Sequence, residues 1–294
     1  MEKETLTMTP LEFFKPVTIE EACNLLAKFK QEAKLLSGGQ SLVPLLQQRL
    51  ISPRCLIDLK GLPEMEYIRE NSDSLSIGAL TAERAIETSS IIKKRFFVLA
   101  EAAHSIGAIQ IRNWGTIGGN LAHADPDGDF GPVLLALEAS AKTISVNGQR
   151  EIPMNEFFIN YFESSVKPDE ILSEVVIPYQ PRRSGGIYHK ELIRAGGRSI
   201  SSMAVVVTLN ENDEIKQAKI VLGCQAGVPI RAAQAEKVAA GRKDGDNMEE
   251  LEKAIAAEAN PAADVLGSKA YKVHLARIIV RHALPVAIKR AKAT

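Results

Sequence analysis

The N-terminal part of the chain carries hydrophobic residues at helical spacing. Thr18 followed by Glu21 forms a capping box, which marks the start of a helix. The apolar residues that follow recur every three or four positions, at Ala22, Leu25, Leu26 and Phe29. These features predict a helix over about 18–30. The apolar run 33–36 then predicts a short buried strand, and residues 42–50 can form a second helix.

β-branched and alternating apolar residues predict a series of strands in the middle of the chain. These strands cover 55–59, 67–77 with a turn at Asn71-Ser72-Asp73, 142–146, 150–152 and 171–177. Asn147-Gly148 is a strong signal for a tight hairpin between two of them. Helices are predicted over about 93–106 and 133–137, and Thr81 is a candidate cap for the helix that follows it.

A break at Pro178-Tyr179-Gln180-Pro181, followed by the polar residues 182–186, predicts a domain boundary. The two domains would cover 1–178 and 183–294. Beyond the break, the pattern predicts strands and then helices, over 187–194, 202–209, 216–226, 230–240, 247–258 and 268–291. Strands followed by helices indicate an α+β domain, here a three-stranded antiparallel sheet with helices on one face. Pro285 is expected to kink the last helix.

Charge and length narrow the functional classes. The chain has 294 residues, with 36 basic and 36 acidic side chains, so no net field would attract nucleic acid or an anionic membrane. Its apolar runs are too short to span a bilayer, and Met1–Pro10 lacks the apolar core of a signal peptide. We therefore expect a cytoplasmic protein without a transmembrane segment.

Cysteine and histidine are too scattered to build a metal centre. Cys23, Cys55 and Cys224 stand alone, without a C-x-x-C pair, and are best interpreted as buried free thiols. No G-x-S-x-G motif or recognisable Cys–His pair is present. The sequence thus predicts neither a metal ligand nor a catalytic nucleophile or base in this chain.

The run Leu36-Ser37-Gly38-Gly39-Gln40 matches the signature of ABC-type ATPases. Such an ATPase also needs a G-x-x-x-x-G-K-[ST] phosphate loop upstream and a strand that ends in Asp-Glu for magnesium. Neither occurs here. The ATPase interpretation is therefore rejected.

A second glycine pair supports another interpretation of the first. Residues 37–41 (S-G-G-Q-S) and 116–120 (T-I-G-G-N) both offer consecutive amides beside hydroxyl or amide side chains. Each pair alone is more often an ordinary turn, but the two together suit a pyrophosphate that is bound without a dedicated lysine.

These two motifs resemble those of the medium, FAD-binding subunit of the molybdenum hydroxylases, the family of carbon monoxide and xanthine dehydrogenases. The resemblance covers nearly the whole chain. It implies a two-part FAD-binding domain of the vanillyl-alcohol oxidase (PCMH) type, with subdomains at about 1–60 and 61–178. A carbon monoxide dehydrogenase flavoprotein-like domain would follow over 183–294. Leu36-Ser37 replaces an alanine that family members carry before their first glycine pair.

The resemblance assigns FAD-binding residues to this chain. The expected pyrophosphate contacts are Leu36, Ser37, Gly38, Gly39, Gln40, Ser41, Leu42, Thr116, Gly118, Gly119 and Asn120. Farther along the cofactor, the expected contacts are Asp129, Leu172, Tyr188 and Lys190, with Ile106 as an apolar wall.

Several of these positions have simpler interpretations. Asp129 could cap the helix near residue 132, Tyr188 could be an ordinary sheet residue, and Lys190 could be solvated. His123, close to the second motif, is best interpreted as a polar loop residue. The run 125–129 begins like a calcium loop, but Phe130 stands where that loop requires glycine.

The implied function is electron transfer. In this family a large subunit with molybdopterin oxidises the substrate, and a small subunit with two 2Fe-2S clusters passes the electrons to FAD on the medium subunit. From there they reach NAD, a quinone or another acceptor. The complex is expected to be a dimer of heterotrimers, and the substrate cannot be inferred from this chain.

Two other functions remain open at this stage. One is a stand-alone FAD oxidoreductase of the vanillyl-alcohol oxidase type, which acts on its substrate directly. The other is a nucleotide-binding module without redox function. The resemblance also excludes the benzoyl-coenzyme A reductase branch, whose extra 4Fe-4S cluster needs cysteines that this chain lacks.

Overall fold

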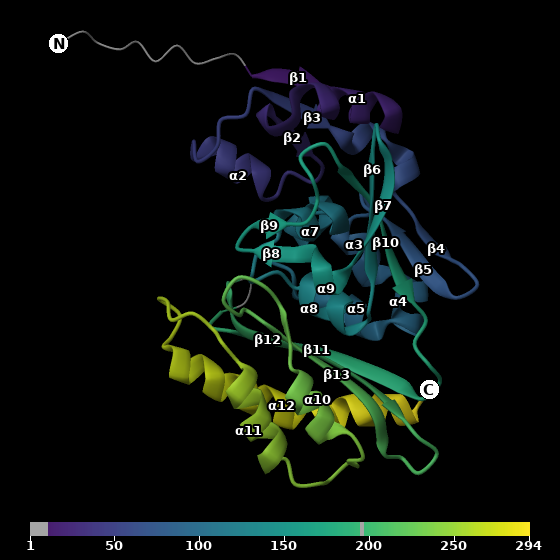
Figure 1. The fold of residues 1–294 in the computed structure, drawn as a ribbon, viewed down its shortest axis with the longest axis vertical. Helices are drawn as coiled ribbons and strands as arrows, with labels where there is room; N and C mark the ends of the chain where they lie inside the picture. The colour runs from purple at the N-terminus through teal and green to yellow at the C-terminus, as the bar shows by residue number, and fades with distance from the viewer. Residues whose placement is uncertain (1–10, 195–196) are drawn as a thin grey trace, which may run out of the picture.

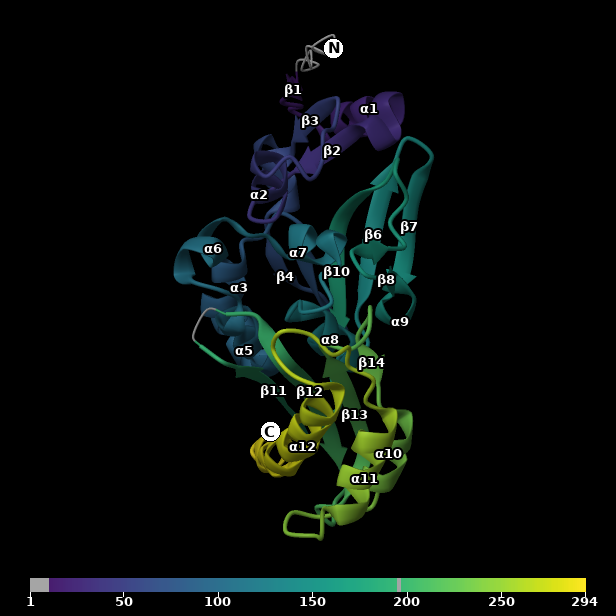
Figure 2. The ribbon, with the colours of Figure 1, turned by 90° about the vertical axis from the view of Figure 1, so that its left-hand side faces the viewer.

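The structure is a computed structural model that describes residues 11–194 and 197–294. A small N-terminal sheet, a five-stranded sheet and a four-stranded sheet follow one another along the long axis of the molecule (Figures 1 and 2). The segment 1–10, which carried the expectation about a signal peptide, lies outside the described residues. No helix within the described ranges is long and apolar enough to cross a membrane.

The N-terminal sheet is parallel, in the order β1-β3-β2, with strands Glu12–Phe14 (β1), Ala33–Leu36 (β2) and Cys55–Asp58 (β3). Its helices are Ile19–Phe29 (α1) and Leu42–Gln47 (α2). Thr18 caps α1 by accepting from the Glu21 N–H at 3.1 Å. The predicted helix, strand and cap are confirmed, although α2 ends three residues early.

The five-stranded sheet is antiparallel. Its order is Ile68–Glu70 (β4), Ser74–Gly78 (β5), Ile171–Pro178 (β10), Ser140–Ser145 (β6) and Gly148–Pro153 (β7). Both predicted hairpins are confirmed, and Ser145 pairs with Gly148 as the Asn147-Gly148 turn requires. A small hairpin, Phe158–Asn160 (β8) and Glu163–Ser164 (β9), was not predicted, because strands this short show no periodicity.

Short helices link β5 to β6. They are Glu83–Thr88 (α3), Ser90–Arg95 (α4), Phe97–Ser105 (α5), Ile109–Trp114 (α6), Ile117–His123 (α7) and Phe130–Ala136 (α8). The prediction of one helix over 93–106 is wrong, because the chain leaves helical geometry at Phe96 (φ −142°, ψ 58°). The Phe96 ring is buried and stacks 6.0 Å from the ring of Tyr179, so tertiary packing overrides the local pattern.

Thr81 does not cap α3, contrary to prediction. Its hydroxyl donates to the Tyr67 carbonyl and accepts from the Tyr67 N–H, and α3 begins after Ala82 without a side-chain cap. The threonine therefore ties the loop before α3 to the residue that precedes β4.

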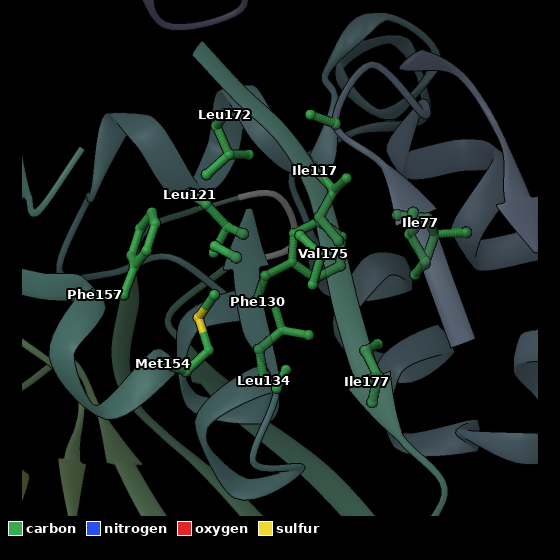
Figure 3. Close-up of a cluster of buried hydrophobic side chains, with 14 of the residues drawn as sticks. Ile77, Ile117, Leu121, Phe130, Leu134, Met154, Phe157, Leu172, Val175 and Ile177 are labelled. Carbon is green, nitrogen blue, oxygen red and sulfur yellow. The ribbon is translucent and has the colours of Figure 1, made fainter. Parts of the chain in front are cut away.

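A hydrophobic cluster holds α7 and α8 against the five-stranded sheet (Figure 3). Phe130 and Phe157, the latter on the one-turn helix Met154–Phe157 (α9), are among its fully buried side chains. The sheet contributes Ile77, Leu172, Val175 and Ile177, and the two helices contribute Ile117, Leu121 and Leu134. Because α7 carries the second glycine motif, this cluster fixes the motif relative to β10.

The C-terminal sheet has four strands, Ser184–Leu192 (β11), Ser199–Leu209 (β12), Ile215–Gly223 (β13) and Ile230–Arg231 (β14). The predicted three-stranded sheet is therefore corrected. Residues 230–231 were assigned to a helix, but they pair with Leu222 and Val221 as an edge strand too short to show a pattern. The helices are Ala233–Ala239 (α10), Glu249–Glu258 (α11) and Lys269–Lys292 (α12), which continues through Pro285.

The C-terminal sheet is covered on both faces. α10 and α12 pack on one face, and α5 and α8 of the preceding region pack on the other (Figures 1 and 2). Every residue of β12 is accordingly buried. This arrangement brings β11, which carries the predicted site residues Tyr188 and Lys190, next to α5.

Candidate functional site

The first glycine motif forms the turn from β2 into α2. Gly39 has a φ of +72°, a left-handed conformation that glycine adopts without steric cost. Gln40 closes the turn by donating from Nε2 to the Gly38 carbonyl at 3.1 Å. Within the described part of the chain, nothing accepts from the backbone N–H groups of residues 39–42. Successive free N–H groups at a helix start form a binding site for phosphate oxygens.

Gly38 is required by close packing. A Cβ at this position would lie 2.1 Å from the carbonyl oxygen of Trp114 and 2.8 Å from the Cα of Gly115. These atoms belong to backbone that leads directly into the second motif. Only glycine lets the two chain segments touch here.

The second glycine motif is not a turn, contrary to prediction. Thr116 is the N-cap of α7 and accepts from the Gly119 N–H at 3.1 Å. The N–H groups of Ile117 and Gly118 donate to Thr81 and Ala79, and that of Asn120 donates to Thr116. The expected consecutive free amides are therefore absent from residues 117–120, since each N–H already has an acceptor.

The two motifs nevertheless meet. The Thr116 hydroxyl donates to the Ser37 hydroxyl at 3.2 Å. A Cβ on Gly119 would lie 2.7 Å from Ser37 Oγ, and a Cβ on Gly118 would lie 2.5 Å from the Cβ of Ala79. The glycines of α7 thus allow close approach of the first motif on one side and of the loop after β5 on the other.

Leu172 lies behind the second motif. It is buried on β10, and its Cδ2 would be 2.9 Å from a Cβ on Gly118. The structure therefore brings the predicted residues 36–42, 116–120 and Leu172 into one cluster.

Asp129, Tyr188 and Lys190 form a second cluster. Asp129 is 4% exposed and accepts from the Tyr188 hydroxyl at 2.8 Å and from Lys190 Nζ at 2.9 Å. Burial raises the pKa of Asp129, and the two donors partly offset that effect. Asp129 precedes α8 but its side chain makes no cap, and Lys190 is not solvated, so the simpler interpretations of these two residues are wrong. Tyr188 is a buried residue of the sheet, as its simpler interpretation held, and its hydroxyl also contacts Asp129.

Ile106 lies beside this second cluster. It follows Ser105, whose carbonyl accepts from Lys190 Nζ at 3.3 Å. The Ile106 carbonyl in turn accepts from Arg112 Nη1 at 2.9 Å, and Arg112 is paired with Glu87 at 2.8 Å. Hydrogen bonds to His104, Arg84 and Arg112 hold the pKa of Glu87 down at about 2 despite its burial.

Glu83 lies against the second motif, a position that the sequence did not indicate. Its carboxyl group is buried beside the second motif, and Oε1 accepts from Asn120 Nδ2 at 3.1 Å. Its position depends on the contact of α3 with the chain before α7, for which the local sequence holds no signal. His123, also near the motif, ends α7 with its ring 5.2 Å from that of Phe162.

The chemistry available here is that of a binding site. The first motif offers free N–H donors, the second offers hydroxyl and amide side chains, and the second cluster offers a lysine held by a buried carboxylate. Neither cluster contains a cysteine or a serine paired with histidine among its hydrogen bonds. The arrangement suits an elongated ligand with an anionic centre.

Comparison with known proteins identifies that ligand class. Residues 9–180 match the family described as FAD binding domain in molybdopterin dehydrogenase, and residues 187–286 match the CO dehydrogenase flavoprotein C-terminal domain. The chain belongs to the FAD-binding medium-subunit family of molybdenum hydroxylases. The first match covers more than half of the chain and contains both glycine motifs.

Several members of this medium-subunit family are similar along almost their whole length. Subunit alpha of the 6-hydroxypseudooxynicotine dehydrogenase complex of Paenarthrobacter nicotinovorans is 36% identical, and the match covers 94% of each chain. The carbon monoxide dehydrogenase medium chain of Hydrogenophaga pseudoflava is 32% identical over 95% of this chain and 97% of that one.

A solved structure agrees with the sequence matches. It is carbon monoxide dehydrogenase from Hydrogenophaga pseudoflava in a form that lacks the Mo-pyranopterin moiety, with a TM-score of 0.91 and 33% identity. The match covers 95% of this chain and 98% of that chain. The medium-subunit fold is therefore shared from the N-terminal sheet to α12, and the chain is an oxidoreductase flavoprotein subunit.

Proposed function

We propose that the first glycine motif binds the pyrophosphate of FAD through the free N–H groups of residues 39–42. This single observation carries the assignment, because four neighbouring donors without acceptors fit a doubly charged group that needs no lysine. Leu36 and Leu42 flank the turn with apolar surface, and the side chains of Ser37 and Ser41 add hydroxyl groups.

The second motif closes the same site from the other side. We assign side-chain contacts with FAD to Thr116 and Asn120, because the backbone N–H groups of α7 are already bonded. Gly118 and Gly119 contribute by keeping the surface free of Cβ atoms. Leu172 supports them from β10.

Asp129, Tyr188, Lys190 and Ile106 belong to the part of the site near the flavin ring. The support is their position side by side at the contact of the two domains, with β11 against α5. The Asp129–Lys190 pair holds a fixed cation out of bulk water. Such a cation would stabilise negative charge on nearby cofactor atoms.

The chain acts as the electron-transfer subunit of a molybdenum hydroxylase complex. FAD, when bound, supplies the capacity to accept electrons one at a time and to pass them on in pairs. The chain's own residues bind and orient the cofactor and exclude water from it. The partners are a small subunit with two 2Fe-2S clusters and a large molybdopterin subunit, arranged as a dimer of heterotrimers.

The stand-alone oxidoreductase is not favoured. The relatives that match this chain along its length include subunits of dehydrogenase complexes with different named substrates. Because substrate identity varies among such close relatives, we assign no substrate and no final acceptor to this chain.

The boundaries of the domains and subdomains are part of the same proposal. We place the domain boundary between residues 178 and 183, and the subdomain boundary within the PCMH-type part near residue 60. The three cysteines are free and buried, which suits a cytoplasmic location.

Affinity purification of the tagged chain from its native cells tests the proposal. The eluate should contain FAD, iron and molybdenum in a ratio of one to four to one, together with two further subunits. A flavin-loaded chain that purifies alone and oxidises a substrate without iron or molybdenum would support the stand-alone enzyme instead.

A further inference from the structure

Glu83 lies directly beneath the second glycine motif. Its side chain is 3% exposed, and a Cβ on Gly115 would be 2.7 Å from its Oε2 atom. Its backbone N–H donates to the Gly115 carbonyl at 2.8 Å, and its Oε1 accepts from Asn120 Nδ2 at 3.1 Å. Oε2 is buried and has no hydrogen-bond partner among the described residues. The carboxyl group is thus enclosed by the chain that enters α7.

Within residues 11–194 and 197–294, no cation pairs with this carboxyl group directly. The charged groups that act on it are Asp129 at the start of α8 and Arg112 on α6. Arg112 is bonded to Glu87, and Arg84, the neighbour of Glu83 on α3, also pairs with Glu87. A buried carboxylate without a paired cation is costly, and burial raises the pKa of Glu83 to about 7.

We propose that Glu83 is a neutral carboxylic acid beneath bound FAD, where it positions the Asn120 side chain and couples FAD binding to the uptake of one proton. This inference rests on the proposed binding of FAD at residues 116–120. The pyrophosphate brings negative charge next to Asn120, and that charge disfavours the ionised form of Glu83. By linkage, ionisation of Glu83 weakens the binding of FAD to the same extent.

The proton has a definite place. Oε1 accepts from Asn120 and keeps that role in the neutral acid, so the proton is held on Oε2, the atom without a donor. Ionisation would leave a second lone-pair-bearing oxygen buried without any donor. The geometry therefore favours the protonated form whenever an anion lies on the other side of Asn120.

Equilibrium binding of FAD to the flavin-free full-length chain, followed by flavin fluorescence from pH 6 to pH 8.5, tests the inference. FAD itself does not change charge in this range. The Kd should rise about fivefold from pH 7 to pH 8 and approach a tenfold rise for each further pH unit. In Glu83→Gln, which keeps an acceptor for Asn120, the Kd should stay low and nearly constant. Glu64→Gln, at an exposed position, is the matched control and should keep the full pH dependence.

A constant Kd in the unmodified chain, or the same rise in Glu83→Gln, would overturn the inference. If Glu83→Gln does not fold, calorimetry of the unmodified chain at pH 7.5 in two buffers of different ionisation enthalpy decides instead. It should show uptake of about 0.8 proton per FAD. Binding without proton uptake contradicts the role of Glu83 alone, whereas absence of FAD binding at every pH contradicts the proposed function.

Discussion

The hydroxyl of Thr116 donates to the hydroxyl of Ser37 at 3.2 Å, across 79 residues of sequence. This bond joins two glycine motifs that lie in different parts of the fold, one at the end of a parallel strand and one at the start of α7. The absence of a Cβ at Gly38 and Gly119 lets them approach. The two motifs therefore form one cluster, in which the first has free N–H groups and the second presents hydroxyl and amide side chains.

Substitution of Gly38 should abolish FAD retention. In Gly38→Ala the new Cβ meets the Trp114 carbonyl oxygen, which is backbone and cannot move aside. Gly119→Val should also release FAD, because its Cβ is directed at Ser37 Oγ. Flavin absorbance of the purified variants measures retention.

Gly241→Asn is the control for these variants. Gly241 also has a positive φ, but a Cβ there meets nothing within 4 Å, and asparagine tolerates this conformation. It should retain full flavin content. Normal flavin content in both Gly38→Ala and Gly119→Val would show that these residues do not form the site.

Removal of Lys190 should destabilise the protein strongly. Lys190→Met leaves the buried Asp129 carboxylate without its cation, at a cost of about 3–5 kcal/mol. The double variant Asp129→Asn/Lys190→Met should recover a large part of that loss, because no charge is then buried. Urea unfolding of Lys190→Met, Asp129→Asn and the double variant, each compared with the unmodified protein, provides a double-mutant cycle. Equal losses in the single and double variants would exclude a direct charge interaction.

Arg112, with one buried acidic partner, should contribute far more to stability than the surface residue Arg54, which has two acidic partners. Arg112→Met breaks a buried pair with Glu87 and releases the Ile106 carbonyl, which should cost about 3–5 kcal/mol. Arg54→Met, at an exposed site where solvent screens both of its ion pairs, should cost far less than Arg112→Met. Thermal unfolding of both variants compares the two losses.

The pH dependence of the Glu87 cluster has a defined sign. The folded-state pKa of Glu87 is about 2, below its ordinary value of 4.5. Its stabilisation is therefore complete above pH 4.5 and is lost as the pH falls toward 2. In Arg112→Met, the free energy of unfolding should depend less on pH between 4.5 and 2. Identical acid-unfolding curves for Arg112→Met and the unmodified protein would show that Arg112 does not lower the pKa of Glu87.

Glu83 should act on stability in the opposite direction. Its pKa is raised from 4.5 to about 7, so its contribution is complete below pH 4.5 and is lost as the pH rises through 7. Between pH 5 and pH 8.5, Glu83→Gln should gain up to about 3 kcal/mol relative to the unmodified flavin-free chain. Urea unfolding at the two pH values measures this gain. If the difference in free energy of unfolding between Glu83→Gln and the unmodified chain is the same at both pH values, Glu83 does not titrate in this range.

Local signals in the sequence were sufficient for much of the fold. The Thr18 cap and the Asn147-Gly148 hairpin depend on neighbouring residues only, and both are confirmed. The break at Phe96 and the edge strand at residues 230–231 depend on tertiary contacts, and both were missed. The hydroxyl of Thr81 is used by Tyr67, a partner 14 residues away that no capping rule considers.

In the candidate site too, features set by neighbouring residues could be predicted and features set by tertiary contacts could not. The two glycine motifs were visible as residue types, but their different roles were not, since two adjacent glycines conceal a helix start. Thr116 as an N-cap was the available signal for α7. The buried position of Glu83 could not be foreseen, because it follows from the contact of α3 with Gly115.

Native mass spectrometry of the intact complex, with stepwise release of its subunits, tests the central claim most directly. This chain should leave the complex carrying one non-covalent FAD, while iron, sulfide and molybdenum remain on the other subunits. The same chain with Gly38→Ala should leave without FAD. Release of the unmodified chain without flavin, or FAD found on another subunit, would contradict the assignment of the FAD site to these two motifs.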